Sequence, residues 1–202
     1  MLKNKFIIAL FAFLSAIGAS AQQDQQARTI LDRVASTYEN SNGLQIKFKG
    51  TQLGTLWIKG ERFVLECGGI KSWFDGQTQW SYVADNEEVN VSSPTYEELQ
   101  VINPYVLATM YRKGFNYRYD GIQKRSGQQG HEVILIPLKQ QDIRNFILLI
   151  DKNSIPVYIG IDMKNGHYEE FIVTHYEPIE LADDFFQFNE KEYPNAEIID
   201  LR

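Results

Sequence analysis

Side chains that commonly bind metals or transfer protons are few in this chain of 202 residues. It has one cysteine and three histidines, His131, His167 and His175. His167 and His175 fall on one expected strand, where eight positions span about 26 Å. That separation is too large for the two imidazoles to share a metal ion, and no H-E-x-x-H or C-x-x-C motif is present. We therefore expect no metal site and no cofactor.

Acidic side chains occur as three adjacent pairs, Glu87-Glu88, Glu169-Glu170 and Asp183-Asp184. Neighbouring residues of a strand point to opposite faces, so such a pair cannot serve as the acid and base of one active site. We interpret all three pairs as solvated surface. The chain also lacks a phosphate-binding loop and the G-x-S-x-G motif of hydrolases. These observations predict a protein without enzymatic activity.

Cys67 is the only cysteine, so the chain cannot form an internal disulfide and must depend on burial for its stability. We interpret Cys67 as a small buried hydrophobe rather than a reactive thiol. It should react slowly with a water-soluble reagent while the protein is folded, and faster once the protein is unfolded.

The first 21 residues have the composition of a secretory signal peptide. Lys3 and Lys5 precede an apolar run over residues 6–17 that is too short for a membrane span. Ala19-Ser20-Ala21 follows as an A-x-A cleavage site. We expect cleavage after Ala21 and export to an extracytoplasmic compartment.

The remaining residues, 22–202, are enough for one domain with a substantial core. Cleavage removes two lysines and no acids, which changes the formal charge from −6 to −8. A domain this acidic is a poor ligand for nucleic acid, because neutralising phosphates requires clustered Lys and Arg. We expect no nucleic-acid partner.

An N-terminal helix is predicted by one apolar stripe with helical spacing, formed by Ala27, Ile30, Leu31, Val34, Ala35 and Tyr38. Asn42-Gly43 ends it. Two short central helices are predicted after residue 94. Thr95-Tyr96-Glu97-Glu98 has the pattern of a capping box, and Asn103-Pro104 favours a second start. Most of the remaining chain has the alternating pattern of strands.

Strands are predicted over residues 44–49, 54–59, 62–67, 87–93, 115–119, 132–138, 145–150, 155–163, 167–176 and 185–188. Residues 72–83 form a hairpin whose Asp75-Gly76 pair favours a type I′ turn. Period-two spacing places Phe63, Leu65 and Cys67 on one face of their strand and leaves Glu66 in solvent. The sequence thus predicts an α+β domain with a large antiparallel sheet, one N-terminal helix and a central helical insertion.

Two motifs carry a resemblance to a known family. Residues 54–59 read G-T-L-W-I-K, and residues 75–82 read D-G-Q-T-Q-W-S-Y. This order is similar to the core signature of the periplasmic lipoprotein carriers of the LolA type. Residues 31–34 resemble the family's first helix, and residues 103–107 fall where the family has its lid helices. Residues 143–163 and 185–188 follow its C-terminal strands.

The resemblance implies an incomplete antiparallel β-barrel, or half-barrel, with the N-terminal and central helices as a lid over a hydrophobic cavity. Acyl chains of lipoproteins would enter between lid and wall. The implied lipid-binding residues are Leu31, Val34, Phe63, Leu65, Trp80, Tyr82, Tyr105 and Val106. For Trp80 and Tyr82, a plain structural role in the barrel wall is an equal alternative.

As a family member, the protein would be a periplasmic carrier that moves lipoproteins from the inner to the outer membrane. Its partners would be lipidated proteins, an inner-membrane release complex and an outer-membrane acceptor, and it would act as a monomer. Two alternatives use the same fold: a sensor of lipids or lipoproteins, and a structural envelope protein with a filled core.

One position departs from the family pattern. Many members have an Arg-Pro pair after the strand that resembles residues 54–59, and that Arg holds the lid closed. Here the pair is Gly60-Glu61. Arg62 is close by, but strand parity directs it away from Phe63 and Leu65. The resemblance therefore leaves open what latches the lid.

Overall fold

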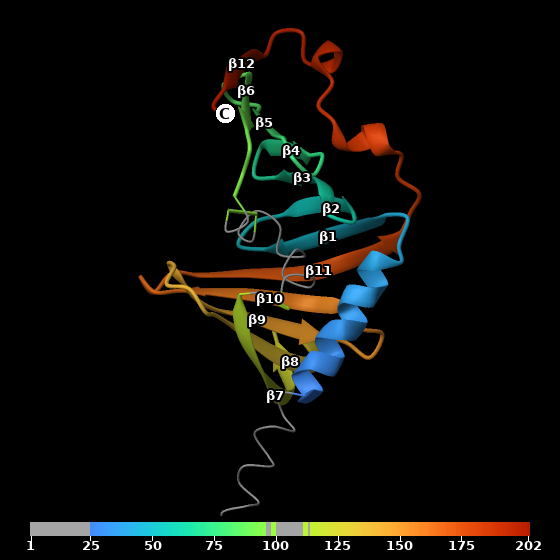
Figure 1. Cartoon of the computed structure of the whole chain (residues 1–202), viewed down its shortest axis with the longest axis vertical. Helices are drawn as coiled ribbons and strands as arrows, with labels where there is room; N and C mark the ends of the chain where they lie inside the picture. The colour runs from blue at the N-terminus through green and yellow to red at the C-terminus, as the bar shows by residue number, and fades with distance from the viewer. Residues whose placement is uncertain (1–24, 96–97, 100–110, 113) are drawn as a thin grey trace, which may run out of the picture.

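Most of the described chain forms one open sheet of twelve strands. Figure 1 shows how this sheet is arranged in the computed structural model. The structure describes residues 25–95, 98–99, 111–112 and 114–202. The strands are β1 (Leu44–Gly50), β2 (Gly54–Lys59), β3 (Arg62–Cys67), β4 (Ile70–Phe74), β5 (Gln79–Val83), β6 (Glu88–Ser92), β7 (Phe115–Arg125), β8 (Gln128–Pro137), β9 (Ile143–Ile150), β10 (Pro156–Met163), β11 (Tyr168–Pro178) and β12 (Glu197–Asp200).

The strand order in the sheet is β12-β6-β5-β4-β3-β2-β1-β11-β10-β9-β8-β7. Every neighbouring pair is antiparallel except β12, which runs parallel to β6. The closure of β1 against β11 joins the two halves of the sequence into one surface. The open sheet and its N-terminal helix agree with the expected half-barrel.

The N-terminal helix covers residues 25–39 and crosses one face of the sheet over β8 to β11 (Figure 1). We call this the inner face. The predicted stripe is confirmed, because its side chains are buried in one cluster with the inner-face residues of the sheet: Ala27, Leu31, Val34, Ala35 and Tyr38, with Ile30 partly buried beside them. The apolar stripe therefore explains both the helix and its place on the sheet.

The expected central helices lie mostly outside the described residues. Of its start, Thr95, Glu98 and Leu99 are described, and Thr95 and Glu98 form the predicted capping box. The Thr95 amide donates to the Glu98 carboxylate over 2.7 Å, and the Glu98 amide donates to the Thr95 hydroxyl over 3.3 Å. These hydrogen bonds hold the pKa of Glu98 below its usual range.

The hairpin between β4 and β5 differs from the predicted two-residue turn. Residues 75–78 connect the strands, and the Asp75 carboxylate accepts from the amides of Gln77 and Thr78 at 2.9 and 2.8 Å. Only Gly76 of this loop has positive φ, at 104°. A type I′ turn needs positive φ at two central positions. The side-chain hydrogen bonds of Asp75 favour the four-residue loop instead.

Residues 185–188 do not form the strand that we predicted. They belong to a C-terminal strap, residues 179–202, which leaves β11 and runs along the outer face to β6 (red in Figure 1). The strap contains two short 3₁₀ helices, η1 (Asp183–Phe186) and η2 (Glu190–Glu192), and ends in β12. Single apolar side chains of the strap pack on the outer face of the sheet. They give the segment an apolar sequence pattern that resembles a strand.

The strap is attached to the outer face by one charged contact and one aromatic cluster. Lys59 Nζ and an Arg62 guanidinium nitrogen each lie 3.1 Å from Asp183 Oδ1, and the Arg62 guanidinium lies over the fully buried Phe186 ring. A second part of the strap packs on the wall, with Tyr193 4.6 Å from Tyr82 between ring centroids. Burial of these rings supplies most of the attachment, and the exposed ion pairs of Asp183 add a smaller part.

Acidification should loosen this attachment. Hydrogen bonds from Lys59 and then Arg62 lower the pKa of Asp183. A lowered pKa in the folded state means that the contribution is complete at neutral pH and is lost as the pH falls through that pKa, below the ordinary aspartate range. We expect Asp183→Asn to speed hydrogen exchange in residues 179–193 at neutral pH, measured by mass spectrometry.

The matched control is Asp184→Asn, which removes the adjacent, exposed carboxylate without touching Lys59 or Arg62. It should leave exchange in the strap unchanged. If both variants accelerate exchange equally, the Asp183 contacts do not hold the strap.

The outer face of β8 to β11 is closed by side chains of the sheet itself. Glu132 is buried, and Arg125 meets its two carboxylate oxygens at 2.5 and 2.9 Å. Beside them, the Tyr158 and Tyr168 hydroxyls lie 2.6 Å apart. Tyr158 packs with Leu149 and other outer-face apolar residues. The second apolar face of β9 is therefore covered by side chains of the sheet itself.

Candidate functional site

A cavity of about 450 Å³ opens on the inner face beside the N-terminal helix. It lies above β1 to β6, with one wall from β10 and β11. Its described lining residues are Phe48, Gln52, Leu56, Leu65, Cys67, Ile70, Ser72, Gln79, Ser81, Val83, Asn90, Ile159, Glu169, Phe171 and Val173. The volume falls within the usual range of about 300 to 1,000 Å³ for small-molecule sites.

The floor of the cavity changes from apolar to polar along one cross-strand row. Residues paired directly across neighbouring strands share a face, and this row runs Ile46, Leu56, Leu65, Ser72, Ser81, Asn90 from β1 to β6. The change falls between β3 and β4. We call the part of the cavity over β1 to β3 its apolar half. We call the part over β4 to β6, where Ile70 and Val83 also line the cavity beside this polar row, its polar half.

The apolar half continues onto β10 and β11. Phe48 and Phe171 pack edge to face, with ring centroids 5.5 Å apart. Phe48 also lies across Gly54, where any side chain would collide with its ring. The aromatic pair therefore forms a wall that can contact a long apolar ligand.

The polar half is connected by hydrogen bonds. Gln79 donates from Nε2 to Ser81 Oγ over 2.9 Å, and the hydroxyls of Ser72 and Ser81 lie 2.9 Å apart. Ser72 and Gln79 are both buried. Polar groups this deep in a cavity can fix the position of one part of a ligand.

Glu169 is the one charged residue among the described lining residues of the cavity. His167 Nε2 lies 3.3 Å from the Glu169 carboxylate. Cys67, which is half-buried rather than fully buried as expected, also lines the cavity, and its thiol lies 2.8 Å from Gln52 Oε1. Burial, and to a lesser extent the Glu169 carboxylate, raise the pKa of the Cys67 thiol.

A family model described as outer membrane lipoprotein carrier protein LolA matches residues 17–167, which is more than half of the chain. The chain belongs to the LolA family. A sequence comparison with curated proteins gives no match. Membership in a family described as lipoprotein carriers makes the inner-face cavity beside the helix the candidate site.

Solved structures resemble the fold at low sequence identity. An uncharacterized conserved protein from Thermus thermophilus is 15% identical, with 87% of this chain and 99% of that chain covered, at a TM-score of 0.62. A DUF1329 family protein from Desulfovibrio piger is 10% identical, with 82% and 97% covered, at 0.50. A LolA superfamily protein from Nitrosomonas europaea is 10% identical, with 80% and 97% covered, at 0.43.

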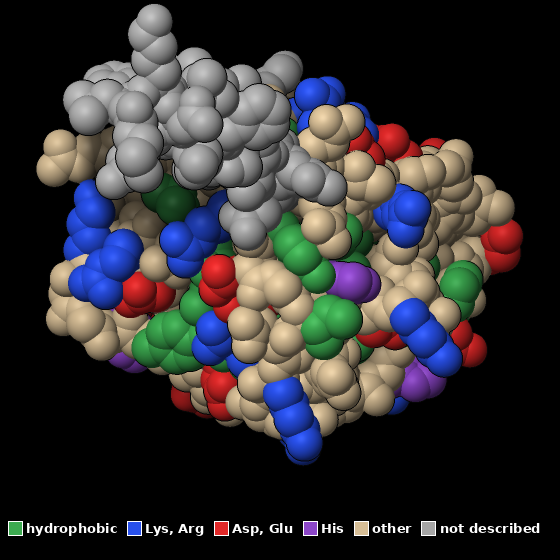
Figure 2. Space-filling model, turned by 90° about the horizontal axis from the view of Figure 1, so that it is seen from below, with side chains coloured by type: hydrophobic (Ala, Val, Ile, Leu, Met, Phe, Trp, Pro, Cys, Tyr) green, Lys and Arg blue, Asp and Glu red, His purple; other side chains and the backbone are tan. Residues whose placement is uncertain are grey.

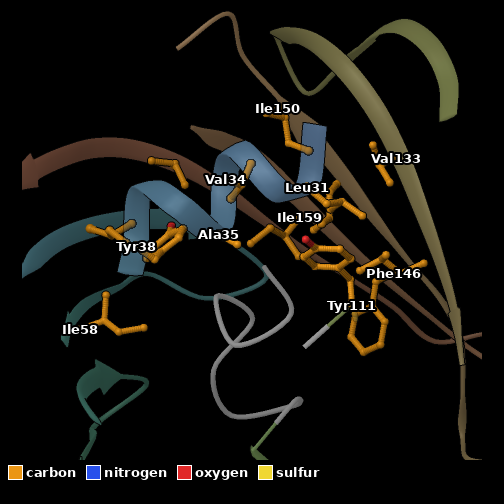
Figure 3. Close-up of a cluster of buried hydrophobic side chains, with 14 of the residues drawn as sticks. Leu31, Val34, Ala35, Tyr38, Ile58, Tyr111, Val133, Phe146, Ile150 and Ile159 are labelled. Atoms are coloured by element: carbon orange, nitrogen blue, oxygen red, sulfur yellow. The ribbon is translucent and has the colours of Figure 1, made fainter. Parts of the chain in front are cut away.

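Two of the predicted lipid-binding residues on the N-terminal helix do not line the cavity. Leu31 and Val34 are fully buried and point from the helix onto β8 to β10, where Figure 3 shows them with Val133, Ile150 and Ile159. The expected gap between this helix and the sheet is filled with side chains. The open volume lies beside the helix instead.

On the sheet, the structure separates the predicted residues further. Leu65 lines the cavity. Phe63, one row away, is fully buried, and its ring centroid lies 5.3 Å from that of Phe74. The shared face of Phe63, Leu65 and Cys67 is confirmed, with Glu66 exposed on the other side. Tyr105 and Val106 lie outside the described residues.

Trp80 and Tyr82 share one face, as predicted, but it is the outer face. Their neighbours Gln79 and Ser81 point into the cavity, so the two aromatic rings point away from it. They pack against the strap together with Trp73. The structure therefore supports the alternative of a structural role in the wall for both residues.

Sequence reasoning missed most of the cavity lining. The signal for the polar half was present, because Ser81 stands between Trp80 and Tyr82 and must face the opposite side of β5. Phe48 and Leu56 likewise lie on strands whose ranges were predicted, and both side chains line the cavity. Ile159, Phe171 and Val173 depend on the pairing of β1 with β11, which no local pattern reveals.

The sequence left open which residue replaces the family's lid-holding Arg at Gly60-Glu61, and the structure answers this in part. Arg62 points to the outer face, as strand parity predicted, and holds the strap rather than a lid. On the inner face, Asp32 of the helix accepts from the Tyr111 hydroxyl, and Arg112 lies 3.3 Å from Glu39. The residues that follow the central segment are thus tied to the helix by polar contacts.

The acidic, His and Cys side chains considered as possible metal ligands do not come together among the described residues. The described residues hold no group of three or more acidic, His or Cys side chains that could bind a metal ion. No helix among them is long and apolar enough to span a membrane. On the face in Figure 2, basic and acidic side chains are intermixed rather than gathered by sign.

Cys67 offers a direct report on whether the cavity is occupied. With its thiol pKa raised, less thiolate is present at neutral pH, so a water-soluble maleimide should label the folded protein more slowly than the urea-unfolded protein. A bound acyl chain should slow labelling further, because Cys67 lines the cavity. Mass spectrometry of the labelled fraction over time measures both effects. Labelling that saturating lipid leaves unchanged would place the ligand away from Cys67.

Proposed function

We propose that this protein is a periplasmic carrier that binds the acyl chains of lipoproteins in the inner-face cavity and moves them from the inner to the outer membrane. The observation that carries the proposal is the cavity, with its apolar wall on a LolA-family sheet. Its proposed partners are lipidated proteins, a release complex of the inner membrane and an acceptor of the outer membrane. The proposed active form is a monomer, exported by cleavage after Ala21.

The physical requirement for such a carrier is simple. Each methylene removed from water contributes about 0.8 kcal/mol, so ten buried methylenes contribute roughly 8 kcal/mol. A lipoprotein with such chains does not cross an aqueous compartment unaided. The wall formed by Phe48, Phe171, Leu56 and Leu65 supplies the apolar surface that this transfer needs.

The test is uptake of a defined cargo. The mature protein is incubated with inner-membrane vesicles that contain a lipidated protein, and native mass spectrometry measures the complex in the soluble fraction. We expect a complex with the triacylated cargo and none with the same protein lacking its lipid. A soluble fraction without any lipidated cargo would overturn the carrier proposal.

A sensor of lipids or a structural envelope protein would give different results in the same experiment. A sensor would bind lipid but would not release the cargo to outer-membrane vesicles. A structural protein would bind neither. The cavity favours the two lipid-binding functions over the structural one, because a filled core would leave no such volume.

A further inference from the structure

The polar half of the cavity is buried, although the hydrocarbon part of an acyl chain forms no hydrogen bonds with polar groups. Ser72 is 5% exposed and Gln79 is 7% exposed, and both line the cavity. Apolar residues at these positions would give a continuous hydrophobic floor. Buried polar groups are unfavourable when they lack hydrogen-bond partners. Their presence here therefore favours a ligand that supplies hydrogen-bond partners.

The hydrogen bonds leave one serine hydrogen without a partner among the described residues. Ser81 Oγ accepts from Gln79 Nε2, and Ser72 and Ser81 share one further bond. Two hydroxyl groups carry two hydrogens, and their mutual bond uses one. The other hydrogen remains available to donate into the cavity, whichever serine carries it.

Gln79 adds a further donor at the same place. Its Nε2 amide carries two hydrogens and donates one to Ser81 Oγ, so the other is available to a ligand. Its buried Oε1 atom accepts no hydrogen bond from the described residues and could bind only a donor. Asn90 extends the polar row by one strand and presents a further amide to the cavity. The polar half therefore offers a small set of neutral hydrogen-bonding groups.

The charge of the cavity limits which ligand group can bind there. Glu169 is the one charged residue among the described lining residues, and it is acidic. A fatty-acid carboxylate or a lipid phosphate would be repelled, because like charges in a partly buried site raise the energy of both. The neutral donors instead fit a neutral acceptor such as an ester or amide carbonyl.

We propose that Ser72, Ser81 and Gln79 form a subsite for the carbonyl groups of ester-linked acyl chains. Neighbouring strands lie about 4.8 Å apart, so a chain that starts from a carbonyl at Ser72 reaches Leu65 on the next strand. It then continues over Leu56 toward the aromatic wall. The inference rests on the proposed function and specifies that the bound lipid is a neutral glycerol ester, held by its linkage as well as by its chains.

The test compares ester-linked probes with ether-linked probes of the same chain length, which lack only the carbonyl oxygens. One pair is a dipalmitoylglyceryl cysteinyl peptide and its dihexadecyl ether. A second pair is dipalmitoylglycerol and its dihexadecyl ether, which represents free membrane lipid. Binding to the mature protein is measured by displacement of a fluorescent lipid. We expect at least one ester to bind roughly tenfold more tightly than its ether, the effect of about one well-formed hydrogen bond.

The variants separate the subsite from the rest of the cavity. The double variant Ser72→Ala with Ser81→Ala should abolish the preference for ester and leave the affinity of the ether probe unchanged. Ser92→Ala is the matched control, because Ser92 lies on β6 but outside the described lining of the cavity. It should retain the full preference. Circular dichroism and urea unfolding confirm that each variant is folded.

The outcomes distinguish this inference from the carrier proposal. Equal affinity for ester and ether in the wild-type protein overturns the ester subsite while the carrier function stands. A failure of all four probes to bind overturns the carrier function itself. A preference seen only with the peptide pair supports the subsite with a lipoprotein as its source, and one seen only with the glycerol pair supports it with a free lipid.

Discussion

Replacing Leu65 by Trp should reduce lipid uptake at least tenfold while the protein stays folded. Leu65 lines the cavity on the last strand of its apolar half. The larger ring would fill space that an acyl chain uses, and displacing two methylenes already loses about 1.6 kcal/mol, which is more than one factor of ten in affinity. Uptake of lipidated cargo from vesicles measures the effect.

The matched control is Glu66→Trp, the same substitution at the next residue of β3. Glu66 is exposed on the outer side of that strand, so its replacement should leave uptake unchanged. Both variants are first compared by urea unfolding, since overpacking costs about 1 to 3 kcal/mol. A folded Leu65→Trp protein that takes up cargo at the wild-type rate would show that the cavity is not the binding site.

Removing Arg125 should destabilise the protein by roughly 3 kcal/mol. Its partner Glu132 is 1% exposed, so Arg125→Ala would leave a buried carboxylate without its bidentate cation. The free energy of unfolding in urea measures the loss. Arg118→Ala, on the exposed side of the same strand, is the control and should change stability by less than about 0.5 kcal/mol.

A rescue variant distinguishes an unpaired charge from lost packing. Arg125→Met combined with Glu132→Leu removes both charges and keeps apolar volume on the outer face beside Leu149. Replacement of a whole buried ion pair by apolar residues is often neutral, so the double variant should recover most of the stability. If it is as unstable as Arg125→Ala, the buried charge is not the cause.

The sequence predicted the fold well wherever one face of an element is buried. Burial of Phe63 and exposure of Glu66 follow from alternation alone, and the helix stripe around Leu31 predicted its own contact with the sheet. Alternation fixes which residues share a face, because a slip by one residue would turn every side chain over.

Alternation does not say which of the two faces is the inner one. Trp80 and Ser81 point to opposite sides of β5. The family resemblance implied that Trp80 contacts lipid, with a structural role in the wall as an equal alternative. The strap packs its own aromatic residues against the outer face, on the side of Trp80. The face of β5 that carries Trp80 and Tyr82 is thus covered by a segment about a hundred residues later in the sequence.

The cavity also depends on information that is not local. Phe171 reaches Phe48 only because β11 closes against β1, and Leu65 meets Ser72 only through the register of β3 and β4. The sequence predicted each strand, but the site lies between strands. Family resemblance gave the existence of a cavity and placed it under the helix, where the structure has packed side chains.

The strap has a consequence for the order in which the protein can fold. Lys59 meets Asp183 across 124 positions of sequence, and β12 pairs with β6, so the first half of the sheet is completed by the last residues of the chain. Such distant pairings form slowly, since the intervening chain must first be closed into a loop. A chain that emerges N-terminus first would display Trp73 and Trp80 on an uncovered surface until the final segment arrives. During that interval the unpaired β6 edge and these rings would be open to other chains, which makes the nascent protein a natural client for a holding chaperone.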